Sequence, residues 1–440
     1  MASVLRAAPV LVLVLVAAAW NRCNLQQHAC PCMCAAEVVF AEDDAGALHI
    51  NTSDPMSQPV LVNGVNMGAV FDAVAAQQSM LQAYQSVMDT QQSRISMQQS
   101  RIAMQQDRIA ALEAEVCSQK MQTHTVGQLQ SSQSAQWLGG VLANNSGVIY
   151  AAPFNADSVL LIDTTTNTVD VTSIAGFTSG GGKWAGAVLA ENGLIYMFAA
   201  SATSMLVVDP ETNTPDTTSI QGLDSTSNKW YSGVLADNGL ILGVPFAADS
   251  VLIVDTTKNT ADTSTLSGLS GRNKWYGGMQ AANGLIYCIP CSATSVLIID
   301  PIALTLDTST IQNLSSQSFK WYGGVLANNG LIFTIPSTAD TTLVINTATD
   351  TTDTLVVSDV TAGGKWVGGV LAPNGNVIGI THGATAVFIL DPASNTTDTS
   401  TLAGFAGDNA KWMDGVLAPN GLIYGIPHNT DTVLVVDPGC

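Results

Sequence analysis

The chain has 440 residues, enough for two or three average domains or for one large repeat domain with an appendage. Hydrophobic residues make up 47% of the sequence and charged residues only 11%, so the chain is too apolar to be disordered and should bury a sizeable core. Its formal net charge of −20 repels phosphate backbones and anionic lipid. This charge argues against a nucleic-acid partner and leaves cationic partners, divalent ions and neutral glycans.

Residues 1–41 are predicted to be a signal peptide followed by a cysteine-rich leader. Arg6 precedes an apolar run over residues 7–20, a pattern typical of secretory signals. The run is too short to span a bilayer comfortably, so we expect cleavage, no membrane insertion of the mature chain, and a secreted or cell-surface glycoprotein. Cleavage after the alanines that end this run and cleavage after Ala41 both fit. The choice decides the fate of the leader cysteines, which are Cys23, Cys30, Cys32 and Cys34.

Residues 42–67 show little periodicity and are predicted to be a linker, whereas residues 68–120 carry a heptad pattern. An apolar side chain recurs at every seventh position, at Val74, Leu81, Met88, Ile95, Ile102, Ile109 and Val116. The second seam position is weaker because it is mostly glutamine. The pattern favours a long helix that forms a homo-oligomeric coiled coil. A lone amphipathic helix lying on the rest of the protein is the alternative.

After residue 135 the sequence is an internal repeat. Its anchors recur at intervals of 45 to 47 residues and are Trp137, Trp184, Trp230, Trp275, Trp321, Trp366 and Trp412. Each repeat parses into four short strands, and Asn-Gly pairs such as Asn238-Gly239 are predicted to supply the positive φ angles of a two-residue hairpin turn. Four antiparallel strands in ~45 residues is the period of a propeller blade. Residues 121–440 are therefore predicted to form an all-β, seven-bladed β-propeller of four-stranded antiparallel blades, preceded by the long helix.

The last repeat ends just after its third strand and lacks a fourth. Counting back from Trp137 by the spacing seen in the other repeats places the missing strand around His124, in residues 122–126. We expect this segment to complete the seventh blade and to close the ring without an open sheet edge. Closure would bring Cys440 close to Cys117, so we hypothesise a disulfide between them. Free thiols or interchain bonds are the alternative.

The repeats resemble a known family. Residues 205–214 (MLVVDPETNT) and the wording GVLAxNGLIY are similar to the YVTN-type propeller repeats of surface-layer and secreted proteins. The fuller wording KWYGGVLAxNGLIYGIP resembles repeat proteins of microbial eukaryotes. The resemblance covers residues 137–440 and not the helix, and it implies an extracellular or surface-displayed propeller with no assigned active site. Gln136, Ser146 and residues 376–378 depart from the pattern.

Positions that differ between repeats are the candidates for a ligand site. The residue after the second-strand proline position varies as Phe154, Ala200, Phe246, Cys291, Ser337, His382 and His428. These residues are expected on the face where propellers usually bind ligands, and His382 and His428 lie on neighbouring blades. Two imidazoles can ligate a metal or bind a polar group, although equivalent points on neighbouring blades lie on the order of 10 Å apart, too far for one ion without loop movement.

Acidic residues and a cysteine add weaker candidates. Asp157 and Asp431 occupy one position of alternate repeats and could contribute to a Ca²⁺ site, but no Asp-x-Asp-x-Asp loop is present, so no metal or other cofactor is predicted. Asp414 replaces a repeat glycine and either lines the axial channel or is a solvated substitution. Cys291 follows Cys288 with a redox-like spacing, but outside any βα context this does not indicate a thioredoxin-type role.

A lysine precedes the tryptophan in six repeats, at Lys183, Lys229, Lys274, Lys320, Lys365 and Lys411. Such a ring could attract an anion. Because a residue repeated in every blade usually serves packing, we favour the interpretation that each lysine pairs with a repeat aspartate such as Asp170 or Asp262. Each tryptophan is then expected to pack between blades.

Catalysis finds little support in the sequence. The repeats contain no Gly-x-Ser-x-Gly elbow and, apart from Asp414, no carboxylate on an inner strand. We therefore expect a non-enzymatic binding or scaffold module for an extracellular glycan or protein, multivalent through residues 68–120. The alternatives are a structural component of an extracellular coat or filament, and a secreted hydrolase or lyase that uses the propeller face.

Overall fold

The computed structural model describes residues 38–42, 48–52, 61–62, 65–117, 121–129, 134–143, 146–357, 364–407 and 410–439, with side chains for all of these except residues 38–62 and 110–117. The chain separates into two compact units, residues 1–112 and 113–440. The predicted signal peptide and the leader cysteines Cys23, Cys30, Cys32 and Cys34 lie outside the described residues. Cys440 and the side chain of Cys117 do so too, so their hypothesised disulfide stays a prediction.

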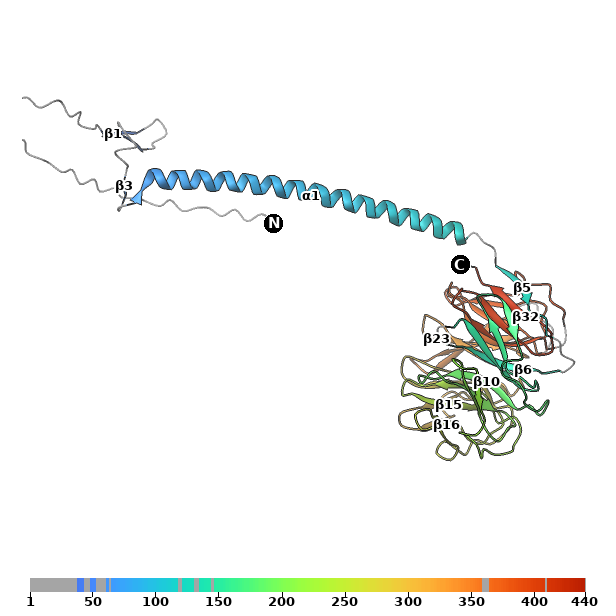
Figure 1. Ribbon diagram of the computed structural model, residues 1–440. Coiled ribbons are helices and arrows are strands. Elements are labelled where there is room, and N and C mark those ends of the chain that lie inside the picture. The colour runs from blue at the N-terminus through green and yellow to red at the C-terminus, as the bar shows by residue number, and fades with distance from the viewer. Residues whose placement is uncertain are drawn as a thin grey trace, which may run out of the picture. The chain divides into compact units, whose positions relative to one another are not determined.

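One long helix, α1 (Met67–Cys117), agrees with the helix predicted over residues 68–120 (Figure 1). It begins where it does because Asn66 caps it: the Asn66 Oδ1 accepts the backbone N–H groups of Gly68 at 3.0 Å and Ala69 at 3.3 Å. No helix in the described part of the chain combines the length and apolar character needed to cross a bilayer.

Two short antiparallel strand pairs precede the helix. β1 (Val38–Glu42) pairs with β2 (Leu48–Thr52), and β3 (Leu61–Val62) pairs with β4 (Val65–Asn66). β1 thus lies mostly at the end of the predicted leader, and β2, β3 and β4 lie in the linker predicted over residues 42–67, where no strands were expected. Strands of two to five residues are too short to produce a recognisable alternating pattern.

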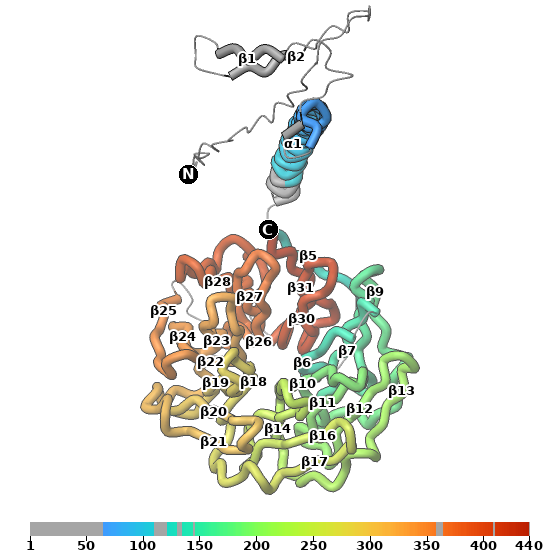
Figure 2. Tube along the Cα trace, turned by 90° about the vertical axis from the view of Figure 1, so that its left-hand side faces the viewer, coloured from blue at the N-terminus to red at the C-terminus, as the bar shows by residue number. Residues whose placement is uncertain are grey.

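Within the described residues, the second unit holds seven four-stranded antiparallel sheets arranged as a ring (Figure 2). This confirms the predicted seven-bladed propeller. The first three blades are β6 (Trp137–Leu142), β7 (Val148–Pro153), β8 (Leu160–Asp163) and β9 (Thr168–Asp170); β10 (Trp184–Leu189), β11 (Ile195–Ala199), β12 (Leu206–Asp209) and β13 (Thr214–Asp216); and β14 (Trp230–Leu235), β15 (Leu240–Pro245), β16 (Leu252–Asp255) and β17 (Thr260–Asp262).

The next three blades are β18 (Trp275–Gln280), β19 (Ile286–Pro290), β20 (Leu297–Asp300) and β21 (Thr305–Asp307); β22 (Trp321–Leu326), β23 (Leu331–Pro336), β24 (Thr341–Asn346) and β25 (Thr351–Val356); and β26 (Trp366–Leu371), β27 (Val377–Thr381), β28 (Phe388–Asp391) and β29 (Thr396–Asp398). The seventh blade is β30 (Trp412–Leu417), β31 (Ile423–Pro427), β32 (Val433–Asp437) and β5 (Gln122–Val126).

The seventh blade is built from both ends of the propeller sequence. β5 pairs antiparallel with β32, from Gln122 opposite Asp437 to Val126 opposite Val433 (Figure 1). The predicted closure is therefore confirmed. It gives β32, whose Val433 and Val435 are fully buried, a neighbour on each side and leaves β5 as the outer strand of the blade.

The core lies between blades, and each tryptophan packs against the blade before its own, as predicted. Trp230 opens the third blade and packs with Tyr196 and Phe198 of the second. Its indole Nε1 donates to the backbone oxygen of Ser250 at 2.8 Å, which satisfies the polar edge of a buried ring. The hydroxyl of Tyr196 in turn donates to Asn259 Oδ1 at 2.6 Å, in the next blade. Apolar packing and polar contacts thus join neighbouring blades.

The hairpin between the first two strands differs from the prediction. Gly239 has φ of 82°, whereas Asn238 is not among the residues with positive φ. The N–H of Gly239 donates to the oxygen of Ala236 at 2.8 Å, as in a type I turn followed by a left-handed glycine. Asn238 instead uses its side-chain Nδ2 to donate to the Pro301 oxygen of the next blade at 2.8 Å. The asparagine therefore joins two blades and does not supply a positive φ.

Candidate functional site

Variable repeat positions from all seven blades meet near the propeller axis. They are the residues that follow each tryptophan and those that follow the second-strand proline position. The buried members are Leu138, Ala185, Ala200, Tyr231, Phe246, Tyr276, Cys291, Val367 and Met413, with Phe154 and Tyr322 packed against them. We call this group the axial cluster. Its members pack against one another, so side chains occupy the centre of the ring at this level.

Aromatic rings dominate the axial cluster in blades three to five. Tyr231 stacks on Phe246 with ring centroids 4.5 Å apart, and Tyr276 lies 4.3 Å from Tyr322. Phe154 contacts Tyr231 edge-on at 5.8 Å. The residues after the proline position were predicted as candidates from their variation between repeats, whereas the tyrosines after the tryptophans were not. The residue after the tryptophan differs between repeats, from Leu138 in the first blade to Met413 in the seventh, and this variation could have identified the position.

The two candidate histidines approach each other beside this cluster. The His382 and His428 ring centroids lie 6.3 Å apart, nearer than the ~10 Å expected for equivalent points on neighbouring blades. His428 Nδ1 lies 2.9 Å from the backbone oxygen of Trp137, and His382 Nδ1 lies 3.1 Å from that of Gly364. Burial lowers the pKa of His382 to about 4 and also lowers the pKa of His428.

Both imidazoles are therefore neutral at pH 7. A carbonyl oxygen only accepts, so each Nδ1 carries the ring proton and each Nε2 keeps its lone pair. The pair can accept hydrogen bonds or protons. No group of three His, Cys, Asp or Glu side chains able to hold a metal ion occurs in the described residues.

Asp414 belongs to a second ring of positions, two residues after each tryptophan. The other members are Gly139, Gly186, Ser232, Gly277, Gly323 and Gly368. Their backbones approach closely: a Cβ added to Gly368 would lie 2.5 Å from the Cα of Asp414, and one added to Gly323 would lie 3.3 Å from the Cα of Gly368. Asp414 itself has φ of 74°, a value that favours glycine.

Five blades of this ring border a cavity of about 100 Å³ near the axis. Asp414, Ser232 and glycine backbones line it together with Tyr231 and Tyr276 of the axial cluster. Burial raises the pKa of the Asp414 carboxyl to about 6, although the Gly415 N–H donates to its Oδ1 at 2.9 Å and opposes the rise. The structure therefore places Asp414 on the axial lining and gives the cavity a titratable acid.

Cys291 is a buried member of the axial cluster, and Cys288 is buried as well. Both thiols are free. Burial raises the pKa of Cys291 to about 12 and raises the pKa of Cys288 further, so neither forms a thiolate near pH 7. Their spacing reflects packing and not redox chemistry.

The aspartate pair lies away from the axial cavity. Asp157 and Asp431 are both exposed. The backbone oxygen of Asp157 accepts the N–H of Phe177, and that of Asp431 accepts the N–H of Leu129. Neither carboxylate lines the cavity beside Asp414. The structure thus separates these two candidates from His382, His428 and Asp414.

The repeated lysines are buried between blades, and the expected partners were wrong. Lys229 Nζ donates to the backbone oxygens of Ala202 and Thr226, each at 2.9 Å. Burial lowers the pKa values of Lys183, Lys229, Lys274 and Lys320 to about 8. Within the described residues none of these four lysines bonds Asp170 or Asp262, so their interactions are structural links between blades that use carbonyls as acceptors.

Asp170 and Asp262 instead accept hydrogen bonds from the turn that follows each of them. The N–H of Thr172 donates to Asp170 at 2.6 Å and that of Ser264 donates to Asp262 at 2.7 Å. Among the described lysines, Lys365 does contact an aspartate, Asp340, at 3.4 Å. The turn-forming aspartates thus accept hydrogen bonds within their own turns, and the lysines donate to backbone carbonyls instead.

No protein-family model and no curated protein matches the chain. Solved structures share its fold at low identity. Virginiamycin B lyase from Staphylococcus aureus is 8% identical with a TM-score of 0.58, covering 72% of this chain and 99% of that one. Hydrazine synthase from Kuenenia stuttgartiensis is 13% identical with a TM-score of 0.53, covering 69% and 96%.

The extracellular domain of a one-component system from B. thetaiotaomicron is 10% identical with a TM-score of 0.53, covering 71% of this chain and 40% of that one. At such identities the likeness concerns the fold alone. The similarity to YVTN-type repeats stays a resemblance. Because a lyase is among the structures that share the fold, the comparisons do not favour the prediction of a non-enzyme.

Proposed function

We propose that the protein is an extracellular binding or scaffold module in which α1 assembles several copies, so that their propellers engage a glycan or protein ligand together. The observation that carries this proposal is the apolar stripe on α1. Val74, Leu81, Met88, Ile95, Ile102 and Ile109 share one heptad position and are between 43% and 71% exposed. A helix of 51 residues is ~75 Å long, and solvent is a poor environment for such a stripe.

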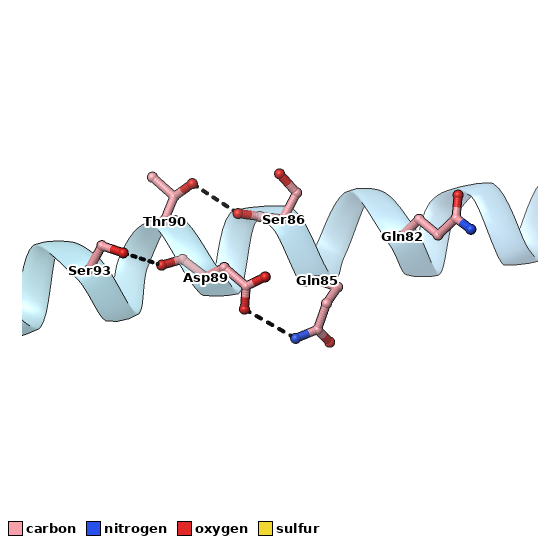
Figure 3. A pocket seen from close by; sticks show the side chains of 6 residues that line it. All are labelled: Gln82, Gln85, Ser86, Asp89, Thr90 and Ser93. Carbon is pink, nitrogen blue, oxygen red and sulfur yellow. Dashed lines mark hydrogen bonds between the residues drawn. The ribbon is translucent and has the colours of Figure 1, made fainter.

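Another face of the helix, over residues 82–93, carries polar side chains (Figure 3). There Gln85 Nε2 donates to Asp89 Oδ1 at 3.2 Å, and Thr90 and Ser93 donate to backbone oxygens one turn earlier. A strict seven-residue repeat keeps a seam facing a partner only when the helices supercoil. A second copy of α1 carries the same repeat and so matches this seam. Joining copies raises the avidity of weak propeller contacts.

The test compares two double variants by analytical ultracentrifugation. Ile95→Asn with Ile102→Asn places polar groups in the stripe and should convert an oligomer to a monomer. Met97→Asn with Met104→Asn changes equally exposed residues outside the stripe and should leave the oligomer intact. Glycan-array binding should fall by a factor on the order of 10² or more with the stripe variant. A monomeric wild-type protein would contradict the proposal.

A secreted lyase is a second candidate, favoured by the neutral His382–His428 pair and by one fold neighbour. That neighbour is a catalytically inactive histidine-to-alanine variant of virginiamycin B lyase with quinupristin, 8% identical to this chain with a TM-score of 0.58. Mass spectrometry of quinupristin incubated with the protein tests this candidate directly. Turnover that disappears with His428→Ala would support it, and no turnover by the wild-type protein would remove quinupristin as a substrate.

A further inference from the structure

The axial cavity contains an acid where the repeat calls for glycine. At the equivalent position five blades have glycine and one has Ser232. Asp414 adopts φ of 74° and packs against the backbone of Gly368. A carboxylate here bears both backbone strain and loss of hydration. Since glycine would remove both costs, packing alone does not explain an aspartate at this position.

A second polar group in the cavity lacks a partner. The Tyr276 side chain is only 5% exposed and lines the cavity; no hydrogen bond of its hydroxyl occurs among the described residues, but the hydroxyl oxygen is not a fully buried atom. The Asp414 carboxylate accepts only the N–H of the adjacent Gly415 within the described part of the chain. The cavity is therefore lined by a carboxylate with acceptor capacity to spare and by the Tyr276 side chain.

We infer that the axial cavity binds a small primary ammonium group, with Asp414 as its counter-ion and Tyr276 as a further contact. An ammonium donates three hydrogen bonds and needs one negative partner, which this cavity supplies. The rings of Tyr231 and Tyr276 at its border add aromatic surface that attracts cations. Ca²⁺ and Mg²⁺ prefer several carboxylate or carbonyl oxygens, whereas Asp414 is the one acidic residue of the lining.

The experiment is isothermal titration calorimetry of the full chain with methylammonium chloride at pH 7.5 and constant ionic strength. Wild-type protein should show saturable binding to one site. Asp414→Asn keeps the shape and removes the charge, and it should weaken binding by about tenfold or more. Asp414→Gly restores the repeat residue and should abolish binding without loss of thermal stability. Asp431→Asn changes an exposed acid of the same blade and should bind like wild type.

The dependence on pH provides a second readout. The titratable groups on the cavity lining are Asp414, Tyr231 and Tyr276, and burial raises both tyrosine pKa values, so only the aspartate changes charge below pH 8. Its raised pKa of about 6 predicts about tenfold weaker methylammonium binding at pH 5 than at pH 7.

Several outcomes would overturn the inference: no saturable binding by wild type, equal binding by Asp414→Gly, or displacement of methylammonium by a similar concentration of Na⁺ or Ca²⁺. The last result would make the cavity an inorganic cation site. These outcomes are independent of the proposed assembly, because the cavity lies wholly in the propeller and the assembly test concerns α1.

Discussion

The helix and the propeller each obey a strict sequence repeat, yet they use it in opposite ways. In the propeller, every copy buries its apolar residues against the neighbouring copy, and the pairing of β5 with β32 leaves no copy without a neighbour. In α1, the heptad copies follow one another along a straight line, and their apolar side chains stay exposed. The closed repeat completes its own core, whereas the linear repeat of α1 leaves its apolar side chains without a core among the described residues.

The largest loss of stability is expected when the ring is opened. A chain that begins at residue 127 lacks β5, so β32 becomes an outer strand with Val433 and Val435 uncovered. Compared with a chain that begins at residue 113, we expect a loss of at least about 4 kcal/mol in the free energy of unfolding. Urea unfolding followed by tryptophan fluorescence measures this loss. A peptide of residues 121–129 should restore part of it, and equal midpoints would contradict the closing role of β5.

A smaller effect is expected from cutting one link between blades. Lys229→Met keeps the apolar stem but leaves the carbonyls of Ala202 and Thr226 without their donor. Relief of the buried charge offsets part of this cost, so we expect a net loss of about 2 kcal/mol in unfolding free energy. The same substitution at Lys258, which is exposed and bonds only its local turn, should change stability by less than about 0.5 kcal/mol. Equal effects of the two variants in urea unfolding would argue against the link.

The smallest change in stability is expected from a substitution that makes the ring more regular. Asp414→Gly should stabilise the protein by about 1 kcal/mol at pH 7, because glycine accepts φ of 74° and removes a buried charge. The folded pKa of Asp414 is raised to about 6, so its ionisation cost is present above pH 6 and disappears as pH falls below about 4. The gain from glycine should shrink over that window. Thermal unfolding at several pH values tests this, and a gain constant with pH would assign it to backbone strain alone.

The fold was predictable because its determinants are periodic. Tryptophan spacing defined the blades, and the missing fourth strand of the last repeat pointed to residues 122–126. Partners across blades were not predictable in the same way. Lys229 was expected to pair with a carboxylate, since sequence shows charges and does not show which carbonyls a loop turns inward. The hairpin at Asn238 was misassigned for a similar reason: its side chain serves the next blade, which no local pattern reveals.

The candidate site was predictable only at positions where a repeat residue is visibly replaced. His382, His428 and Asp414 broke the repeat visibly, and the structure places all three near the axis. Their distances and ionisation depend on how seven first strands converge, which sequence spacing does not encode. Tyr276 escaped notice because aromatic residues follow several of the tryptophans and looked like part of the repeat.

Closure by β5 and β32 also imposes an order on biosynthesis. Gln122 and Asp437, which face each other in the finished sheet, are separated by 315 positions along the chain. β32 is synthesised long after β5, so β5 must wait for translation of the intervening blades before it meets its partner. Six blades can form during elongation, but the ring can be sealed only after β32 has left the ribosome. Protection of the early strand during that interval is thus a requirement that the architecture places on the cell.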